Sequence, residues 1–186
     1  MRITKEPEVR KQEILDTALK LFGENGYEKT SITDIAKAIG VAQGLCYRYF
    51  PSKEALFDGA IEQYADVLVE QLVGFEKDDH KSLRQIIEDM PATMEDRDAK
   101  YYSVFHQAEN KKFHDQLSLK VCEKLVPPVE KLLQRAQQNG EIQIDDLQAA
   151  AMFCVYGQLG ILLADELTQE DKSKRIREFL IYALRL

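Results

Sequence analysis

Residues 30–53 read TSITDIAKAIGVAQGLCYRYFPSK, a pattern of two short helices around a turn. The first helix places apolar residues at the spacing of one buried face: Ile32, Ile35, Ala36 and Ile39. A Gly-Val pair at 40–41 makes the turn, and the second helix is expected over about residues 42–50. Two helices joined in this way form a helix-turn-helix, the unit that presents a helix to the major groove of DNA.

Local signals mark the ends of these helices. Ser31 precedes Asp34 by three residues, which is a near match to a capping box at the start of the first helix. Pro51 closes the second helix, and Ser52 is expected to cap a long helix that begins near Lys53.

Helical spacing also dominates the rest of the chain, and no segment alternates as a strand does, so the sequence predicts an all-α fold. Before the motif, a helix over about residues 8–24 is expected to end at Asn25-Gly26. After it, we expect helices over about residues 53–75, 82–94, 99–110, 113–139, 145–167 and 170–185. Pro127 and Pro128 are expected to kink or split the helix that contains them.

Composition limits the kinds of protein that this chain can be. Its 186 residues are 45% hydrophobic, enough for a packed core. No apolar run approaches the roughly 20 residues of a membrane span, and the N-terminus lacks the apolar core of a signal peptide. We therefore expect a cytoplasmic location and no membrane partner. Three cysteines without metal-type spacing indicate buried, reduced thiols.

The net charge of −7 is unexpected for a protein that binds DNA. Its distribution removes much of the conflict, because residues 1–54 hold nine Lys and Arg against eight Asp and Glu. The remaining residues hold 16 basic and 24 acidic side chains, so the excess acidity lies outside the helix-turn-helix. Only a local basic surface is needed against phosphates, and affinity for DNA should fall steeply with salt.

The second helix of the motif must pack on one side and meet DNA on the other. Its expected groove-facing residues are Gln43, Gly44, Leu45, Tyr47 and Arg48. Gln43 can pair with adenine, and Arg48 with guanine or a phosphate. Gly44 has no side chain and so permits close approach of backbone and DNA.

Four further groups suit the phosphates of the duplex. Tyr47 and Tyr49 offer hydroxyls, while Thr33 and Lys53 lie in the first turns of their helices. The alternative for all of these residues is a plain surface helix in a helical protein.

Ordered motifs from residue 9 to residue 60 resemble the TetR/AcrR family. They are ILDTALKLF at 14–22, GY at 26–27, TSITDIA at 30–36, GV at 40–41, Gly44, YRYF at 47–50 and SKEAL at 52–56. Beyond residue 60, only the length and the helical character agree with the family.

The resemblance implies a homodimeric transcription factor, usually a repressor, which a small molecule releases from its operator. It implies phosphate contacts from Thr33, Tyr47, Tyr49 and Lys53. It also implies base-edge or backbone contacts from the remaining groove-facing residues, Gln43, Gly44, Leu45 and Arg48. The chain departs from the family at Ala42, where Ser or Thr is frequent and a helix cap could be lost, and at Leu45, where a small hydroxyl residue is common. Leucine favours apolar contact with a thymine methyl group.

Two domains follow from this resemblance. Residues 1–53 are expected to form a three-helix DNA-binding domain with its recognition unit at about 31–50. Residues 54–186 are expected to form a helical ligand-binding and dimerisation domain. The fourth helix joins them without a linker, so it could carry motion from one to the other.

The last two helices are the expected dimer interface, because small residues on the penultimate helix allow close helix approach. The expected interface residues are Phe153, Gly157, Gly160, Ile161, Ala164, Phe179, Leu180 and Leu184. The alternative is that these residues pack only within one chain.

An effector pocket is expected among the later helices, where aromatic and Met side chains suit apolar ligands. Its candidate lining residues are Met90, Met94, Tyr101, Tyr102, Phe105, His106, Phe113, Met152 and Tyr156. The spacing of His106 and Glu109 is too weak a pattern to predict a metal site, and we expect no cofactor.

The sequence thus predicts a regulator that binds a palindromic operator as a dimer and responds to a small-molecule effector of unspecified identity. One rival interpretation is a helical small-molecule-binding or scaffold protein with a vestigial helix-turn-helix. Another is an enzyme built on the later helices, which the absence of a nucleophile–base pattern or a glycine-rich phosphate loop disfavours.

Overall fold

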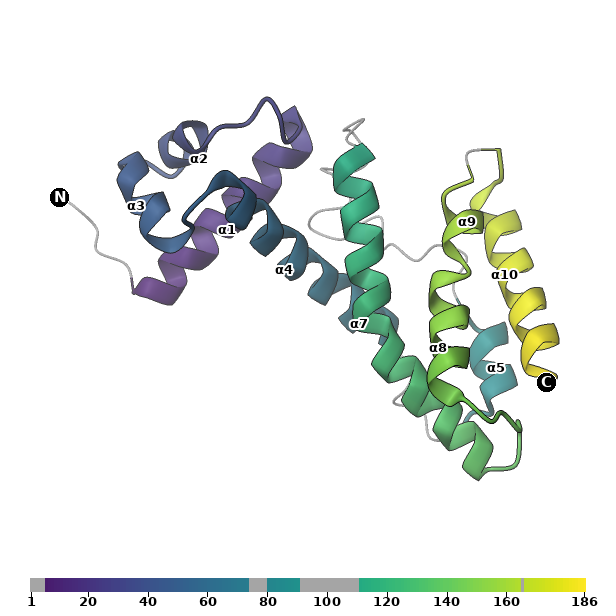
Figure 1. The fold of residues 1–186 in the computed structure, drawn as a ribbon. Coiled ribbons are helices and arrows are strands. Elements are labelled where there is room, and N and C mark those ends of the chain that lie inside the picture. Colours follow the sequence, from purple (N-terminus) through teal and green to yellow (C-terminus); the bar gives the residue numbers. More distant parts are fainter. Residues whose placement is uncertain (1–5, 74–79, 91–110, 165) are drawn as a thin grey trace. The chain divides into compact units, whose positions relative to one another are not determined.

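The computed structural model describes residues 6–73, 80–90, 111–164 and 166–186 (Figure 1). Within these ranges the chain forms α-helices joined by turns, with no strand, so the predicted all-α fold is confirmed. The predicted helix at 99–110 lies outside the described residues. No helix in the described ranges is long and apolar enough to cross a membrane.

The chain divides into two compact units, and the division falls inside helices. Helix α4 (Lys53–Val73) belongs to the first unit up to Ala65 and to the second from Asp66. Helix α7 (Lys111–Gln138) passes from the first unit to the second after Leu117. The compact units therefore divide within α4, whereas the domain boundary expected from the sequence lies at its start.

The first unit contains the helix-turn-helix. Its helices are α1 (Pro7–Asn25), α2 (Ile32–Ala38), α3 (Gln43–Tyr49) and the start of α4. Apolar side chains from all four helices are fully buried and form its core: Ile14, Ala18, Leu19, Phe22, Ile35, Cys46, Leu56 and Ala60. This burial is the main source of stability for α2 and α3, which have seven residues each and would be marginal alone.

The turns between these helices have the expected chemistry. Gly26 after α1 and Gly40 after α2 have φ angles of 84° and 69°, a region that favours glycine. The predicted capping box is present, because the Ser31 hydroxyl accepts from the Asp34 amide and the Asp34 carboxylate accepts from the Ser31 amide. Ser52 caps α4 as expected, accepting from the Ala55 amide at 3.0 Å.

The second unit packs α5 (Leu83–Glu88), α8 (Leu147–Tyr156), α9 (Leu159–Leu162) and α10 (Gln169–Leu184) with most of α7. Its core includes Leu83, Ile87, Leu133, Ala136, Ala151, Ile176, Leu180 and Leu184. Polar contacts tie its elements together. The Glu141 carboxylate accepts from the Leu83 amide at 2.6 Å, and the Lys172 ammonium donates to the Leu162 carbonyl at 2.7 Å.

Three predicted helices differ from those observed. Helix α7 runs without a break past Pro127 and Pro128, because Cys122 before them and Leu133 after them are both buried and anchor the two halves. The predicted helix at 145–167 is instead divided into α8 and α9. Glycine at position 157 disfavours helix, and the Gln158 side chain donates to the Cys154 carbonyl, so the helix ends there.

Helix α5 is shorter than the predicted 82–94. It ends at Glu88, with Asp89 as its C-cap, two residues before Pro91. A proline disfavours helical backbone in the residue that precedes it, so an early end is favoured.

Candidate nucleic-acid interface

Helix α3 separates an inner side from an outer side within seven residues. Cys46 is fully buried beneath it, and Phe50 at its C-cap is also buried. The outer side carries exposed Gln43, Gly44, Tyr47 and Arg48, while Leu45 and Tyr49 are half-buried. The structure thus brings the predicted groove-facing residues together on one short helix.

Gly44 is not required by the fold. Its backbone is helical, and a Cβ atom added there would meet no other atom within 4 Å. A glycine at an open helical position costs about 1 kcal/mol relative to alanine. The space beside it therefore suits a partner that approaches the backbone closely.

The N-terminus of α3 lacks a side-chain cap. Ala42 is the N-cap residue in extended backbone, and it makes no capping hydrogen bond. The loss of a cap that the sequence suggested is confirmed. With no hydroxyl at position 42, a hydrogen bond to DNA there must come from the backbone.

Thr33 lies half-buried in the first turn of α2, next to Asp34, whose carboxylate is part of the capping box of that helix. The Asp34 carboxylate accepts hydrogen bonds from the Ser31 hydroxyl and the Ser31 amide, and these bonds lower the pKa of Asp34. Because Asp34 adds a negative charge there, a phosphate at Thr33 would be held mainly by its hydroxyl.

Lys53 is held by two neutral groups at the start of α4. Its ammonium lies 4.1 Å from the centroid of the Tyr27 ring and donates to the Glu28 carbonyl at 3.4 Å. Sequence reasoning missed the contribution of Tyr27, which is 26 positions away. The Gly26-Tyr27 pair among the family motifs was the signal that could have directed attention to it.

The expected dimer residues fall into two groups. Phe153 and Phe179 are 80% and 62% exposed, and Gly157 and Gly160, which follow Phe153 in the sequence, are also exposed. Tyr182, one turn after Phe179 and also 80% exposed, was missed by the sequence analysis. We call Phe153, Phe179 and Tyr182 the exposed aromatic set.

Leu180 and Leu184 lie instead in the core of their own unit. Ile161 and Ala164 are half-buried. The helical spacing identified the apolar stripe of α10, but the stripe faces the chain's own core and only its flank is exposed.

Much of the expected effector pocket lies outside the described residues, namely Met94, Tyr101, Tyr102, Phe105 and His106. The side chain of Phe113 is outside them too. Met90 and Tyr156 are half-buried, and Met152 is largely exposed. Among the described residues, no three His, Cys, Asp or Glu side chains are placed to hold a metal ion.

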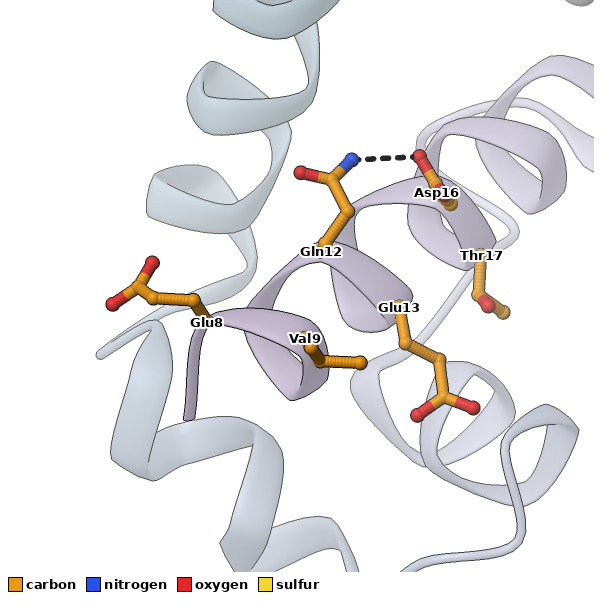
Figure 2. Close-up of a pocket in the computed structure, with 6 residues that line it drawn as sticks. All are labelled: Glu8, Val9, Gln12, Glu13, Asp16 and Thr17. Carbon is orange, nitrogen blue, oxygen red and sulfur yellow. Dashed lines mark hydrogen bonds between the residues drawn. The ribbon is translucent and has the colours of Figure 1, made fainter. Parts of the chain in front are cut away.

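Figure 2 shows a surface hollow elsewhere, on α1. It is lined by Glu8, Val9, Gln12, Glu13, Asp16 and Thr17. The Gln12 amide donates to the Asp16 carboxylate at 2.9 Å within it. Its three carboxylates and single apolar side chain do not resemble the apolar pocket that the sequence predicts.

Known proteins to which this chain is similar include regulators of transcription. The family model described as "Bacterial regulatory proteins, tetR family" matches residues 14–60. The chain is 49% identical over 53 residues to the HTH-type transcriptional regulator YuxN of Bacillus subtilis (strain 168), which covers 28% of this chain and 18% of that protein. It is 41% identical over 59 residues to the HTH-type transcriptional repressor KstR2 of Rhodococcus jostii (strain RHA1), covering 32% of this chain and 29% of that protein.

These curated relatives are matched over less than a third of their own length. Similarity to solved structures extends further. GusR of Salmonella enterica has a TM-score of 0.68 at 25% identity, covering 98% of each chain. A transcriptional regulator from Cytophaga hutchinsonii has a TM-score of 0.66 at 18% identity, covering 95% of this chain and 99% of that one, which supports the fold alone.

Proposed function

From the premise that this chain belongs to the tetR family of bacterial regulatory proteins, we propose that it is a sequence-specific DNA-binding regulator of transcription. In this proposal it is a repressor that a small-molecule effector releases from its operator. The observation that carries the proposal is α3, with Cys46 buried inside and Gln43, Tyr47 and Arg48 exposed outside. A regulator of a bacterial chromosome would work in the cytoplasm.

The exposed groups divide by chemistry into those that read bases and those that hold phosphates. Gln43 and Arg48 can donate to base edges in the major groove, and Leu45 can contact a thymine methyl group. Phosphates would be held by the hydroxyls of Thr33, Tyr47 and Tyr49 and by the ammonium of Lys53. Phosphate contacts fix the position of the protein, and base contacts select the sequence.

The regulator would act as a homodimer. The exposed aromatic set places three large side chains of α8 and α10 in water, and apolar side chains of this size are costly to leave there. Exposed Gly157 and Gly160 would permit close approach of a partner helix. A two-fold dimer would place two α3 helices in successive major grooves roughly 34–36 Å apart on a palindromic operator.

The effector would bind in the second unit and favour a spacing of the two α3 helices that does not fit both half-sites. Helix α4 is continuous from one unit to the other and is the proposed route for this coupling. Coupling between two sites is reciprocal, so operator DNA must weaken the binding of the effector by the same factor.

The test is selection of bound duplexes from a random pool. We expect the wild-type protein to enrich a palindromic sequence whose affinity falls steeply with salt. A matched variant, Gln43→Ala with Arg48→Ala, changes two exposed side chains and should keep the helical circular dichroism spectrum while losing the enrichment. A wild-type pool without any enriched sequence at low salt would contradict the proposal.

A further inference from the structure

The Tyr27 ring and the Lys53 ammonium make a cation–π contact, with the nitrogen 4.1 Å from the ring centroid. Tyr27 lies in the turn after α1, and Lys53 is the first residue of α4. The ring is itself fixed, because its centroid lies 4.4 Å from that of Phe57 and 5.5 Å from that of Phe22. Tyr27 therefore offers the lysine a surface that the core holds in place.

The groups that hold Lys53 leave its charge available. Several other lysines pair with carboxylates, such as Lys124 with Asp66 at 2.6 Å and Lys120 with Glu123 at 2.8 Å. The contacts of Lys53 go instead to a ring face and to a carbonyl oxygen. A lysine paired with a carboxylate has no net charge as a pair, and the carboxylate would have to be displaced before the ammonium met a phosphate. Lys53 and its two neutral partners together keep a charge of +1.

Carboxylates that could compete are close by. Burial raises the pKa of Tyr27, and the negative charges of Glu54, Glu28 and Asp58 raise it further, so these charges act on the ring. A free lysine stem has several rotatable bonds and could turn towards any of them. The ring and the Glu28 carbonyl hold the ammonium in one of the available positions.

We propose that Tyr27 is a positioning residue for DNA binding, which holds the Lys53 ammonium over its ring so that the charge meets a phosphate already oriented. This inference rests on the proposed function and adds a residue that makes no DNA contact itself. The benefit is entropic, because a side chain ordered before binding loses less freedom when it binds. A cation–π contact at a partly exposed site is worth about a 2- to 5-fold change in affinity for each protomer.

The test replaces Tyr27 with phenylalanine and then with phenylalanines that carry one, two or three ring fluorines. Fluorination changes the shape of the ring little, but it progressively removes the negative charge of its face. We expect Tyr27→Phe to bind the selected operator within about 2-fold of wild type, and each added fluorine to weaken binding, while the melting temperature stays nearly constant. Affinity that does not change along this series would overturn the inference.

A second variant shows whether the effect passes through Lys53. Lys53→Met should weaken binding and lower the slope of log affinity against log salt by about one for each protomer. In the Lys53→Met background, fluorination should have no further effect, since the ring then has no cation to hold. An equal loss in both backgrounds would mean that the ring acts on the fold and would overturn the inference. A wild-type protein that prefers no DNA sequence would instead overturn the proposed function, and this inference with it.

Discussion

Within one helical turn of α3, neighbouring residues have opposite environments. Cys46 is fully buried while Tyr47 is 46% exposed, so a change at either position has a different consequence. A substitution at Cys46 acts on the core, but one at Tyr47, Arg48 or Gly44 acts on whatever the outer side contacts. This separation lets stability and DNA binding be tested independently at single residues.

Gly44→Ala should stabilise the fold and weaken DNA binding. Alanine has the higher helix propensity by about 1 kcal/mol, and no atom lies within 4 Å of the new Cβ. We expect a slightly higher melting temperature. We also expect operator affinity, measured by fluorescence anisotropy, to fall about 10-fold, because the added methyl group would occupy the space in which DNA approaches the backbone of α3.

Gly59→Ala is the matched control for that variant. A Cβ at position 59 would lie 3.1 Å from Leu15 Cδ2 and 3.3 Å from Phe50 Cε1, so alanine there crowds the buried side, and we expect no gain in melting temperature and no loss of operator affinity. Unchanged operator affinity in Gly44→Ala would mean that DNA does not approach the backbone at that position.

Gln43 and Lys53 should differ in the kind of effect rather than in its size. Gln43→Ala should change which bases are preferred at one position of each half-site, at a cost of about 1–3 kcal/mol for the preferred base. Lys53→Gln should weaken binding to all sequences uniformly and make it less dependent on salt. Competition binding with a set of single-base operator variants distinguishes the two, and the reverse result would exchange the phosphate and base roles.

The three cysteines should react slowly in the native protein. Burial raises the pKa of the Cys122 thiol to about 11 and also raises the pKa values of Cys46 and Cys154. Since the folded pKa of Cys122 exceeds its unfolded value, its contribution to stability is complete below the unfolded pKa and is lost as pH rises towards 11. We expect little labelling by a thiol reagent at pH 8 until urea is added; rapid native labelling would contradict this.

At this scale, the sequence could predict residues whose partners are near in the chain. Ser31 and Asp34 form their capping box because both partners lie within one turn. The contact of Lys53 with Tyr27 depends on how α4 returns to the end of α1, and no local pattern encodes that. Leu180 and Leu184 show the same limit, since spacing identifies an apolar stripe but not the surface that it faces.

The elements depart from the predicted ones for two reasons, which are tertiary packing at α7 and local helix-ending signals at α5 and α8. A double proline would end an isolated helix, yet α7 continues because buried residues hold both of its halves. Conversely, the apolar run at 145–167 would favour one helix, but Gly157 and the Gln158 amide end α8. Helix type could be predicted from periodicity, whereas the continuation of α7 past its two prolines depends on packing that the local sequence does not encode.

The capping box of α2 should make the stability of the first unit depend on pH. Hydrogen bonds from Ser31 lower the pKa of Asp34. Because the folded pKa lies below the unfolded value, the contribution of Asp34 to stability is present above the unfolded pKa of about 3.9 and is lost as pH falls through the folded pKa. Ser31→Ala should therefore lower the urea midpoint more at pH 7 than at pH 3.

The control for that experiment is Thr168→Ala, which removes a cap that α10 receives in the second unit. If the units unfold separately, each substitution should affect only its own transition. A Ser31→Ala effect of equal size at pH 7 and pH 3 would mean that the Asp34 charge contributes nothing to the cap.

Over the whole molecule, charge is distributed by function rather than evenly. Residues 1–54 carry a net charge of +1 and the remaining residues a net charge of −8, so the acidic part would be repelled by DNA as the helix-turn-helix binds it. This charge distribution can be read directly from the sequence. The position of the division inside α4 could not be predicted in this way, since it depends on which core each turn of one continuous helix packs against.

Operator binding should fail when the exposed aromatic set is disrupted, although α3 is untouched. Phe153→Arg places a charge at an 80% exposed position, so the folded chain should retain its melting temperature within a few degrees. Analytical ultracentrifugation at micromolar concentration should show the proposed dimer for the wild type and a monomer for Phe153→Arg. Affinity for the full palindrome should then fall on the order of 100-fold, because each half-site is bound separately.

Leu119→Arg is the matched control, because Leu119 is also exposed, at 54%, but lies on α7 outside the exposed aromatic set. It should leave both the dimer and operator affinity unchanged. If Phe153→Arg remained a dimer with full affinity, the two-fold interface would have to lie elsewhere. A wild-type monomer that bound the palindrome tightly would show that one copy of α3 supplies the affinity. The proposed effect of the effector on the spacing of two α3 helices would then be contradicted, because no second half-site would be released.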